Sequence, residues 1–386
     1  MGNIINPNEY GGLLFDNNEV DAVKNVLLNK KIFRYALKEK SQTDIFEESI
    51  CKRYNKKYAL GVNSGTSGLK VALKSIGLRV GDRVLVSAYT FIATATSVLA
   101  LGGIPIPIDT DLEYGMNLED LENELKKGCK AIILVHFQGK CFDLKPIIKL
   151  KKKYKVLLIE DACQAMETKC NGIYAGTLSD IGVFSFQQNK PLTSGEGGII
   201  ITDNEKYYTI ARNYSDMGSV RDYYPSWDKS GALIGDNYRM NNIQGAILNE
   251  QLKKLDKMVK MQIKNKMYIL NNINNKDILC KILNNTDDNG MNILFLTNSV
   301  ENANKCIEIA SKKNIEIRHL WSKPYYLQKV IIDANLKPKD LGKKDCLMAE
   351  KISNLLLSIN LPPTLTKKDL DIISKLLNKL IKEKFL

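Results

Sequence analysis

Apolar residues in the first half of the chain gather in short, nearly continuous runs that alternate with amphipathic stretches. The runs cover residues 83–87, 104–108, 131–135, 156–159, 181–186 and 198–202. Such runs are typical of strands buried on both faces of a parallel sheet. Helical spacing of apolar residues is found instead at residues 20–28, 45–54, 118–127 and 144–154. The alternation predicts a large α/β domain, with a mostly parallel sheet covered by helices.

The pattern changes near residue 250. Apolar residues recur at helical spacing from residue 242 to residue 270, which predicts one long helix connecting two domains. Beyond it, residues 291–296 and 315–318 are predicted strands, and residues 370–380 a closing helix. We read the Asn/Lys-rich residues 271–289 as a surface loop. We therefore expect a large domain with an N-terminal arm over residues 1–250 and a smaller α+β domain over residues 251–386.

Composition adds limits on size and partners. With 386 residues and 44% hydrophobic content, the chain can bury the cores of two domains. Its net charge of +13 raises the question of nucleic-acid binding. The basic stretches at residues 151–153, 337–344 and 367–384 lie mostly among acidic or apolar residues, as on solvated helix faces. Because no RNA-recognition motif or zinc knuckle accompanies them, we expect no nucleic-acid partner, although a basic rim can attract an anionic substrate.

Cysteine and histidine usage indicates the compartment and the absence of a metal. The 8 cysteines form no C-x-x-C pair, and the 2 histidines exclude a histidine-rich metal site. No signal-like segment and no apolar run of roughly 18 residues is present. We therefore expect a cytoplasmic protein with reduced thiols, no bound metal and no contact with a membrane.

Three segments carry candidate chemistry. Lys190 follows a strand-like run and precedes a glycine turn at residues 195–198, among small and polar neighbours that do not suit a core. Asp161 ends another predicted strand, and open α/β sheets bind ligands at the carboxyl ends of their strands. Residues 63–68 (Asn-Ser-Gly-Thr-Ser-Gly) precede a helix-like run. Small hydroxyl residues at a helix start leave backbone N–H groups free for a phosphate.

A phosphate cradle, a strand-end carboxylate and a lysine are the three protein groups that pyridoxal 5'-phosphate requires. The cradle holds the phosphate, the carboxylate keeps the pyridine nitrogen protonated, and the lysine forms a Schiff base. Taken singly, the three features also fit a surface lysine, a helix N-cap and an ordinary strand-to-helix turn. Together and in this order, they favour a pyridoxal-phosphate enzyme.

The segments that contain these residues resemble a known family, the DegT/DnrJ/StrS-type sugar aminotransferases, which are fold-type I enzymes dependent on pyridoxal phosphate. The matching segments are residues 46–47, 63–67, 88–95, 135–139, 160–165, 184–198 and 237–240. The resemblance implies a three-layer αβα large domain with a mostly parallel sheet, plus a smaller α+β C-terminal domain.

The resemblance also implies roles around the ring of the cofactor. Lys190 would carry the Schiff base and then shuttle the proton, and Asp161 would form a salt bridge with the pyridinium. Gln164 would sit near the ring hydroxyl, and Phe91 would stack on the pyridine face. Phe91 also fits helix packing, because the residues after it have helix-like character.

Four further residues would bind the phosphate. Gly65, Thr66 and Ser185 would hold it within one subunit, and Asn237 would reach the phosphate bound in the neighbouring subunit. The resemblance therefore implies a homodimer with an active site shared between its subunits.

The implied reaction moves an amino group from glutamate or glutamine to a keto sugar, in amino-sugar biosynthesis for a surface polysaccharide or a secondary metabolite. The acceptor in this family is typically nucleotide-linked. Residues 187–188 and 192–198 also resemble the branch that uses glutamine to aminate keto-cyclitols, which keeps the acceptor open. A non-catalytic pyridoxal-phosphate-binding regulator is a further alternative, against which the intact Lys190, Asp161 and Gln164 speak. Residues 317–326 match the family only loosely, so the resemblance assigns no substrate contact there.

Overall fold

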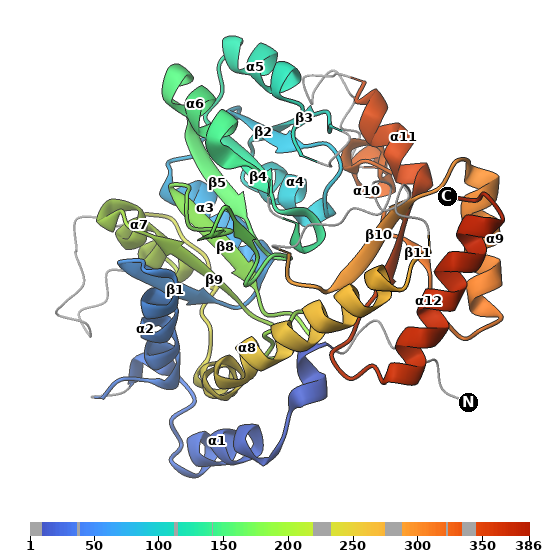
Figure 1. Cartoon of the computed structure of the whole chain (residues 1–386). Helices are drawn as coiled ribbons and strands as arrows, with labels where there is room; N and C mark the ends of the chain where they lie inside the picture. The colour runs from blue at the N-terminus through green and yellow to red at the C-terminus, as the bar shows by residue number, and fades with distance from the viewer. Residues whose placement is uncertain are drawn as a thin grey trace.

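The larger part of the molecule is built around a seven-stranded sheet (Figure 1). The computed structural model describes residues 10–36, 39–111, 115–140, 142–218, 233–274, 288–321, 323–333 and 345–386. The strand order is β1-β9-β8-β5-β4-β2-β3. The strands are β1 (Tyr58–Val62), β2 (Arg83–Ser87), β3 (Ile104–Ile108), β4 (Ala131–Val135), β5 (Leu157–Asp161), β8 (Ile181–Ser185) and β9 (Gly198–Thr202). Of these strands only β9 runs opposite to the rest, which confirms the prediction of a mostly parallel sheet.

Helices cover both faces of this sheet. The helices of this part of the chain are α1 (Asn17–Leu28), α2 (Gln42–Tyr54), α3 (Gly65–Ser75), α4 (Ile92–Leu99), α5 (Leu118–Lys126), α6 (Leu144–Tyr154) and α7 (Glu205–Ser215). Val84 and Val86 of β2 join the core formed with α3 and α4, whereas Leu85 between them joins the core formed with α5 and α6. Alternate residues of a strand point to opposite faces, so both faces are apolar and the strands read as continuous apolar runs. The predicted three-layer αβα arrangement is confirmed.

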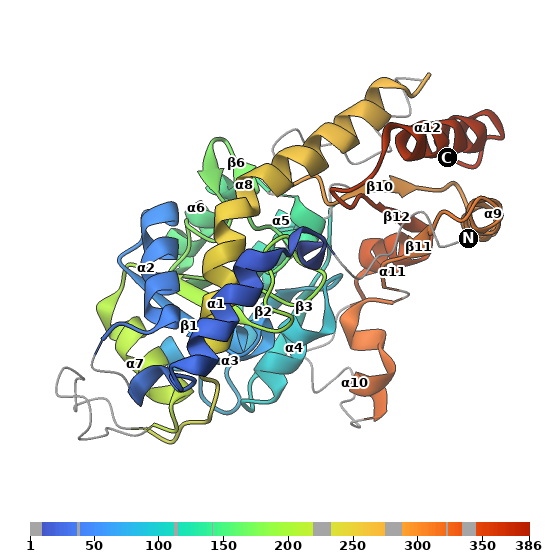
Figure 2. The same cartoon turned by 90° about the horizontal axis from the view of Figure 1, so that it is seen from below.

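A long helix, α8 (Asn242–Asn271), runs from the large sheet to the C-terminal part of the molecule (Figure 2). There a three-stranded antiparallel sheet has the order β10-β12-β11. Its strands are β10 (Asn292–Leu296), β11 (Arg318–His319) and β12 (Leu356–Asn360), and its helices are α9 (Val300–Ser311), α10 (Lys329–Asp333), α11 (Leu347–Leu355) and α12 (Lys367–Lys382). This is the predicted α+β part. The predicted boundary at residue 250 falls within α8 and stays a prediction.

Shorter elements are also found in the described part of the chain. They are the 3-10 turns η1 (Gly11–Leu14), η2 (Arg34–Ala36), η3 (Phe137–Gly139) and η6 (Tyr325–Leu327), and the hairpin strands β6 (Lys169–Cys170) and β7 (Ile173–Tyr174). Capping boxes begin α1, α2, α8 and α12, in each case with a polar N-cap side chain and a polar residue three positions later.

Two predictions in the C-terminal part need correction. The strand expected at residues 315–318 is shifted: Ile315 and Ile317 are buried, but only Arg318 and His319 pair with β12. The central strand β12 was not predicted, because it follows α11 without a break and its apolar residues continue those of the helix. For the loop expected at residues 271–289, residues 275–287 lie outside the described part, and Asn271 still belongs to α8.

Candidate active site

A cavity of about 490 Å³ opens where the carboxyl ends of β5 and β8 face the starts of α3 and α4. All but one of the predicted site residues line it: Gly65, Thr66, Phe91, Asp161, Gln164, Ser185 and Lys190. These residues come from separate segments spread over residues 65–190 of the chain. The topology therefore brings the predicted set together at the edge of the sheet where open α/β folds bind ligands.

Asn237 lies elsewhere on the same chain. Its side chain is exposed, its backbone N–H donates to Asp236 Oδ1 at 2.7 Å, and it forms a bridge with Asp216. It does not line the cavity of its own subunit. Its role toward a neighbouring subunit stays a prediction.

Asp161 is the last residue of β5 and only 5% exposed. Its Oδ2 accepts a hydrogen bond from Thr94 Oγ1 of α4 at 2.8 Å, and its Oδ1 accepts one from the Cys163 N–H at 3.2 Å. A buried carboxylate needs such donors or a cation, because burial in a low dielectric disfavours its charge. The two bonds fix the carboxylate in one orientation at the cavity wall.

Lys190 lies in the loop between β8 and β9. Its N–H donates to Gln187 O at 2.9 Å, and the Gln188 N–H donates to Gly195 O at 2.9 Å, so the predicted glycine turn closes this loop. Burial lowers the pKa of the Lys190 amine, although Cys163 and Asp161 act in the opposite direction. A lowered pKa increases the neutral fraction of the amine, which is its nucleophilic and basic form.

Cys163 stands beside Lys190 in the same cavity. Burial and the charge of Asp161 raise the pKa of its thiol well above the ordinary value. The thiol is therefore protonated at neutral pH and is a poor nucleophile.

The first turn of α3 forms the predicted phosphate cradle. Ser64 caps the helix: its Oγ accepts the Ser67 N–H at 3.1 Å. Gly65 begins the helix, and a Cβ at this position would lie 2.9 Å from both Cys163 Sγ and Ser185 Cβ. Only glycine allows the helix start to approach Ser185 so closely. The free N–H groups of the first turn and the helix dipole suit this turn to an anion.

The C-terminal part contributes residues that the sequence did not predict. Arg318, Leu320 and Trp321 line the cavity, although no substrate contact was predicted in residues 317–326. The Trp321 ring lies 5.2 Å from the Phe137 ring and 6.4 Å from the Phe91 ring. The ion pair of Arg318 with Glu316 is long, at 4.0 Å. The sequence signal available for these residues was the apolar and aromatic segment beside the short strand. Because this segment matches the family only loosely, no role was assigned to it.

The residues present fit pyridoxal phosphate. The start of α3 and Ser185 can bind the phosphate, Asp161 can pair with the pyridinium nitrogen, and Lys190 can bond to the aldehyde. Among the described residues there is no group of three or more His, Cys, Asp or Glu that could hold a metal ion. No helix of the described part is long and apolar enough to cross a membrane.

Comparison with known proteins agrees with this fold. The chain matches the model of the DegT/DnrJ/EryC1/StrS aminotransferase family over residues 15–378 and belongs to this family. The GDP-perosamine synthase of Escherichia coli O157:H7 is 35% identical over 217 residues, which are 55% of this chain and 58% of that protein. A putative L-glutamine:3-amino-2,3-dideoxy-scyllo-inosose aminotransferase of Streptoalloteichus tenebrarius is 29% identical over 214 residues, which are 55% of this chain and 51% of that protein.

The chain thus spans between half and two thirds of the length of these curated relatives. A solved structure described as Helicobacter pylori PseC, an aminotransferase involved in the biosynthesis of pseudoaminic acid, superposes with a TM-score of 0.85. It is 22% identical, and the match covers 98% of this chain and 99% of that one. This likeness shows the fold.

Proposed function

We propose that this protein is a pyridoxal-phosphate-dependent aminotransferase that moves an amino group from glutamate or glutamine to a nucleotide-linked keto sugar. One observation carries the proposal: Lys190, Asp161 and the first turn of α3 all open into a single cavity. Membership of an aminotransferase family supports it, as does the match to a GDP-perosamine synthase. Amino-sugar biosynthesis for a surface polysaccharide or a secondary metabolite follows as the proposed role.

Pyridoxal phosphate, when bound, supplies an electron sink for the α-carbon of the amino donor. Asp161 would hold the proton on the pyridine nitrogen, and Thr94 together with the Cys163 N–H would keep the carboxylate aimed at it. The first turn of α3 and Ser185 would bind the phosphate group. These contacts orient the ring before any substrate arrives, which is the positioning work that a protein contributes to such a reaction.

Lys190 is proposed as the residue that moves the proton. Its Nζ would take the proton from the α-carbon of the amino donor and pass it on within the same half-reaction; with the keto acceptor, the same amine would supply a proton to the carbon that receives the amino group. The lowered pKa of Lys190, caused by burial, suits its role as a base, because it increases the share of the amine that is neutral and able to accept a proton. Phe91 would pack on one face of the ring.

The presence of Arg318 in the cavity supports the proposal that the substrate is an anion. Arg318 is a cation on the wall opposite the strand ends, its side chain is 40% exposed, and its ion pair with Glu316 is long. Glutamate carries a carboxylate that an arginine binds in a bidentate way, and a nucleotide sugar carries a diphosphate that it binds equally well. Trp321 beside it offers a flat apolar surface for a sugar or a base.

A homodimer with shared active sites belongs to the same proposal. Asn237 is exposed on its own chain and neighbours Ile234, which is 96% exposed. In such a dimer Asn237 would bind the phosphate held by the partner subunit.

A keto-cyclitol is the second candidate acceptor. The match to a putative L-glutamine:3-amino-2,3-dideoxy-scyllo-inosose aminotransferase favours it, as do the sequence features of residues 187–198. The two candidates differ in the acceptor and agree on Lys190, Asp161 and the cradle.

The test is the absorbance spectrum of the purified protein with pyridoxal phosphate, followed during titration with L-glutamate and L-glutamine, for the wild type and for Lys190→Ala. We expect a band of the lysine-bound cofactor that one donor converts to the pyridoxamine form, and no such band in Lys190→Ala. A band that no donor converts would indicate the non-catalytic regulator. Absence of any lysine-dependent band in the wild type would overturn the proposal.

A further inference from the structure

A chain of amide groups runs from the cavity to the first strand of the C-terminal sheet. The Gln138 N–H donates to Gln164 Oε1 at 2.9 Å, and Asn292 Nδ2 donates to Gln138 Oε1 at 2.6 Å. Gln138 and Gln164 both line the cavity. Asn292 is the first residue of β10 and is buried. Two hydrogen bonds therefore join the cavity wall to β10.

The first of these bonds sets which end of the Gln164 amide faces the cavity. A backbone N–H can only donate, so the Gln164 atom that meets it at 2.9 Å must be the oxygen. The Nε2 group, with its two N–H donors, is the end left for a ligand. A donor placed beside a ring hydroxyl favours the ionised form of that hydroxyl, because it hydrogen-bonds the negative oxygen.

Gln138 holds an uncommon backbone conformation to make this bond. Its φ is 51°, in the left-handed region that residues other than glycine seldom adopt, and it lies within η3. Such a conformation persists when the surrounding structure fixes it, and it is concentrated at functional sites. The side-chain bond from Asn292 is one contact that fixes it.

Asn289 holds the main chain of the same segment. It is fully buried, and its Nδ2 donates to Gln164 O at 3.1 Å and to Met166 O at 3.3 Å. A Cβ at Gly139 would overlap the Asn289 side chain, so glycine is needed next to Gln138. Asn289 thus holds the backbone of Gln164, and Asn292, three residues further along the chain, holds the side chain of Gln138.

We propose that Gln138 and Asn292 are positioning residues that aim the Gln164 amide nitrogen at the hydroxyl of the bound cofactor ring, and so couple this ring to the C-terminal sheet. This inference rests on the proposed function, because it takes the ring to be that of pyridoxal phosphate. The sheet that begins at β10 also carries Arg318 on β11, through β12. One rigid unit therefore orients both the ring contact and the cation that faces the substrate.

The consequence is electronic as well as geometric. With Asn292 shortened to alanine, Gln138 loses its side-chain anchor, and its backbone N–H, which holds Gln164 Oε1, is positioned less firmly. The Gln164 amide nitrogen is then aimed less well at the ring hydroxyl, and the ionised form of that hydroxyl becomes less stable. Since a hydrogen bond to a charged group is among the stronger ones, we expect the titration midpoint of the lysine-bound cofactor to rise by about one pH unit.

The experiment compares four holoenzymes: the wild type, Asn292→Ala, Asn292→Asp and Asn265→Ala. Asn265→Ala is the matched control: Asn265 is also buried near the C-terminal part, and its Nδ2 donates to Pro362 O at 3.2 Å, but it has no contact with Gln138. Asn292→Asp keeps the side-chain shape, and the Gln138 amide can turn to donate to the new carboxylate. The absorbance of the bound cofactor is titrated with pH for each, and cofactor dissociation is measured by equilibrium dialysis.

We expect the midpoint to rise in Asn292→Ala, to stay near the wild-type value in Asn265→Ala, and to be largely restored in Asn292→Asp. An unchanged midpoint in Asn292→Ala that still binds the cofactor would overturn the inference, as would equal shifts in both alanine variants. If Asn292→Ala does not fold, Asn292→Asp decides: a shift as large as one pH unit there contradicts the inference. Failure of the proposed function is recognised separately, because the wild type would then show no lysine-dependent band.

Discussion

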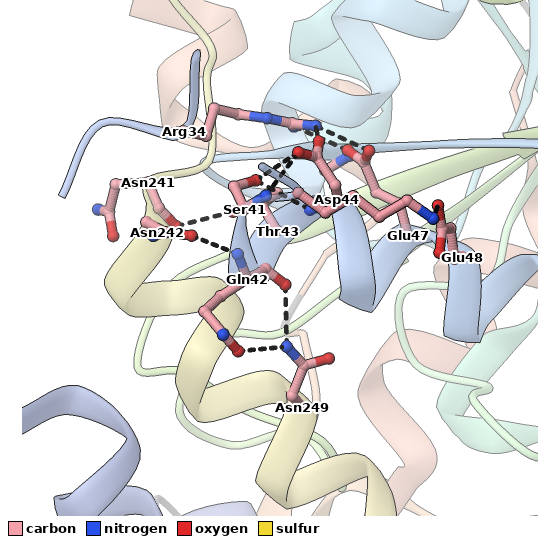
Figure 3. A network of polar contacts seen from close by, with 12 residues as sticks. Arg34, Ser41, Gln42, Thr43, Asp44, Glu47, Glu48, Asn241, Asn242 and Asn249 are labelled. Atoms are coloured by element: carbon pink, nitrogen blue, oxygen red, sulfur yellow. Dashed lines mark hydrogen bonds and ion pairs between the residues drawn. The ribbon is translucent and has the colours of Figure 1, made fainter. Parts of the chain in front are cut away.

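Replacing Arg34 with methionine should remove the cation that organises a polar network beside β1, the edge strand of the large sheet (Figure 3). Arg34 is 5% exposed, and its guanidinium donates to both carboxylate oxygens of Glu47 at 2.8 Å and to Asp44 Oδ1 at 2.6 Å. Glu47 also accepts the Gly61 N–H of β1 at 2.6 Å. The network thus joins η2, α2 and β1.

The same network reaches α8. The Gln42 N–H donates to Asn242 Oδ1 at 2.6 Å, and Asn249 Nδ2 donates to Gln42 O at 2.9 Å (Figure 3). Loss of Arg34 therefore disturbs the point where α2 meets the helix that leads to the C-terminal part.

The expected loss of unfolding free energy follows from the burial of Arg34 and Glu47. Burial opposes the charge of Arg34, but Glu47 and Asp44 outweigh this effect and raise its pKa well above the ordinary value. Arg34→Met leaves Glu47, which is 7% exposed, without its cation. Breaking one side of a buried ion pair costs about 3 to 5 kcal/mol of unfolding free energy. The ion pair between Lys40 and Glu48 of α2 provides the control: its side chains are 66% and 59% exposed, and losing it costs less than about 1 kcal/mol.

The assay is urea unfolding at neutral pH, followed by circular dichroism, for the wild type, Arg34→Met, Glu48→Gln and the double variant Arg34→Met with Glu47→Gln. The double variant should recover part of the loss, because no carboxylate is then left unpaired at Glu47.

Burial raises the pKa of Asp44, yet Arg34 and Ser41 more than compensate and the net pKa is lowered. A carboxyl group whose pKa is lowered in the folded state stabilises that state at pH values above its ordinary pKa. This stabilisation is lost as the pH falls through the lowered pKa, so the difference in unfolding free energy between wild type and Arg34→Met should shrink below about pH 4. A loss in Arg34→Met no larger than that in Glu48→Gln would refute the reasoning.

Three further predictions concern the cavity. Thr94→Val removes the 2.8 Å hydrogen bond to Asp161, and we expect about a tenfold loss of cofactor affinity by equilibrium dialysis, with an unchanged Kd as the contradicting result. Gly65→Val places a side chain where even a Cβ would lie 2.9 Å from Ser185 Cβ. The affinity for pyridoxal phosphate should fall at least about tenfold, while the affinity for pyridoxal, which lacks the phosphate, should change little. Equal losses of affinity for the two compounds would contradict the phosphate cradle. Arg318→Met should raise the KM of one anionic substrate about tenfold or more, Arg318→Lys less so, and unchanged KM values for donor and acceptor would show that Arg318 binds neither.

The large sheet could be predicted from the sequence because its strands are buried on both faces. Residues 104–108 and 131–135 read as apolar runs and form β3 and β4 with those bounds. The three-stranded sheet was harder to predict. β11 has two paired residues, and β12 continues directly from α11, so neither has the bounded run that identifies a strand.

The residues of the candidate site also fall into a group that could be predicted from the sequence and a group that could not. Asp161 and Lys190 stand in local patterns, a strand end and a glycine turn, that a sequence displays directly. Gln138 does not: its part in the site depends on a left-handed φ and on a bond from Asn292, which lies 154 positions away. Arg318 likewise reaches the cavity only because the C-terminal sheet packs against the strand ends. Contacts between distant segments are set by tertiary packing and have no local signature.

The central claim is that Lys190 binds pyridoxal phosphate covalently and releases it to an amino donor. Its most direct test is reduction of the holoenzyme with borohydride, followed by peptide mass spectrometry, with and without prior incubation with L-glutamate or L-glutamine. We predict that the reduced cofactor is found on the peptide that contains Lys190, that one donor abolishes this label, and that Lys190→Ala carries none. Label on other lysines that persists in Lys190→Ala and in the presence of both donors would contradict the account.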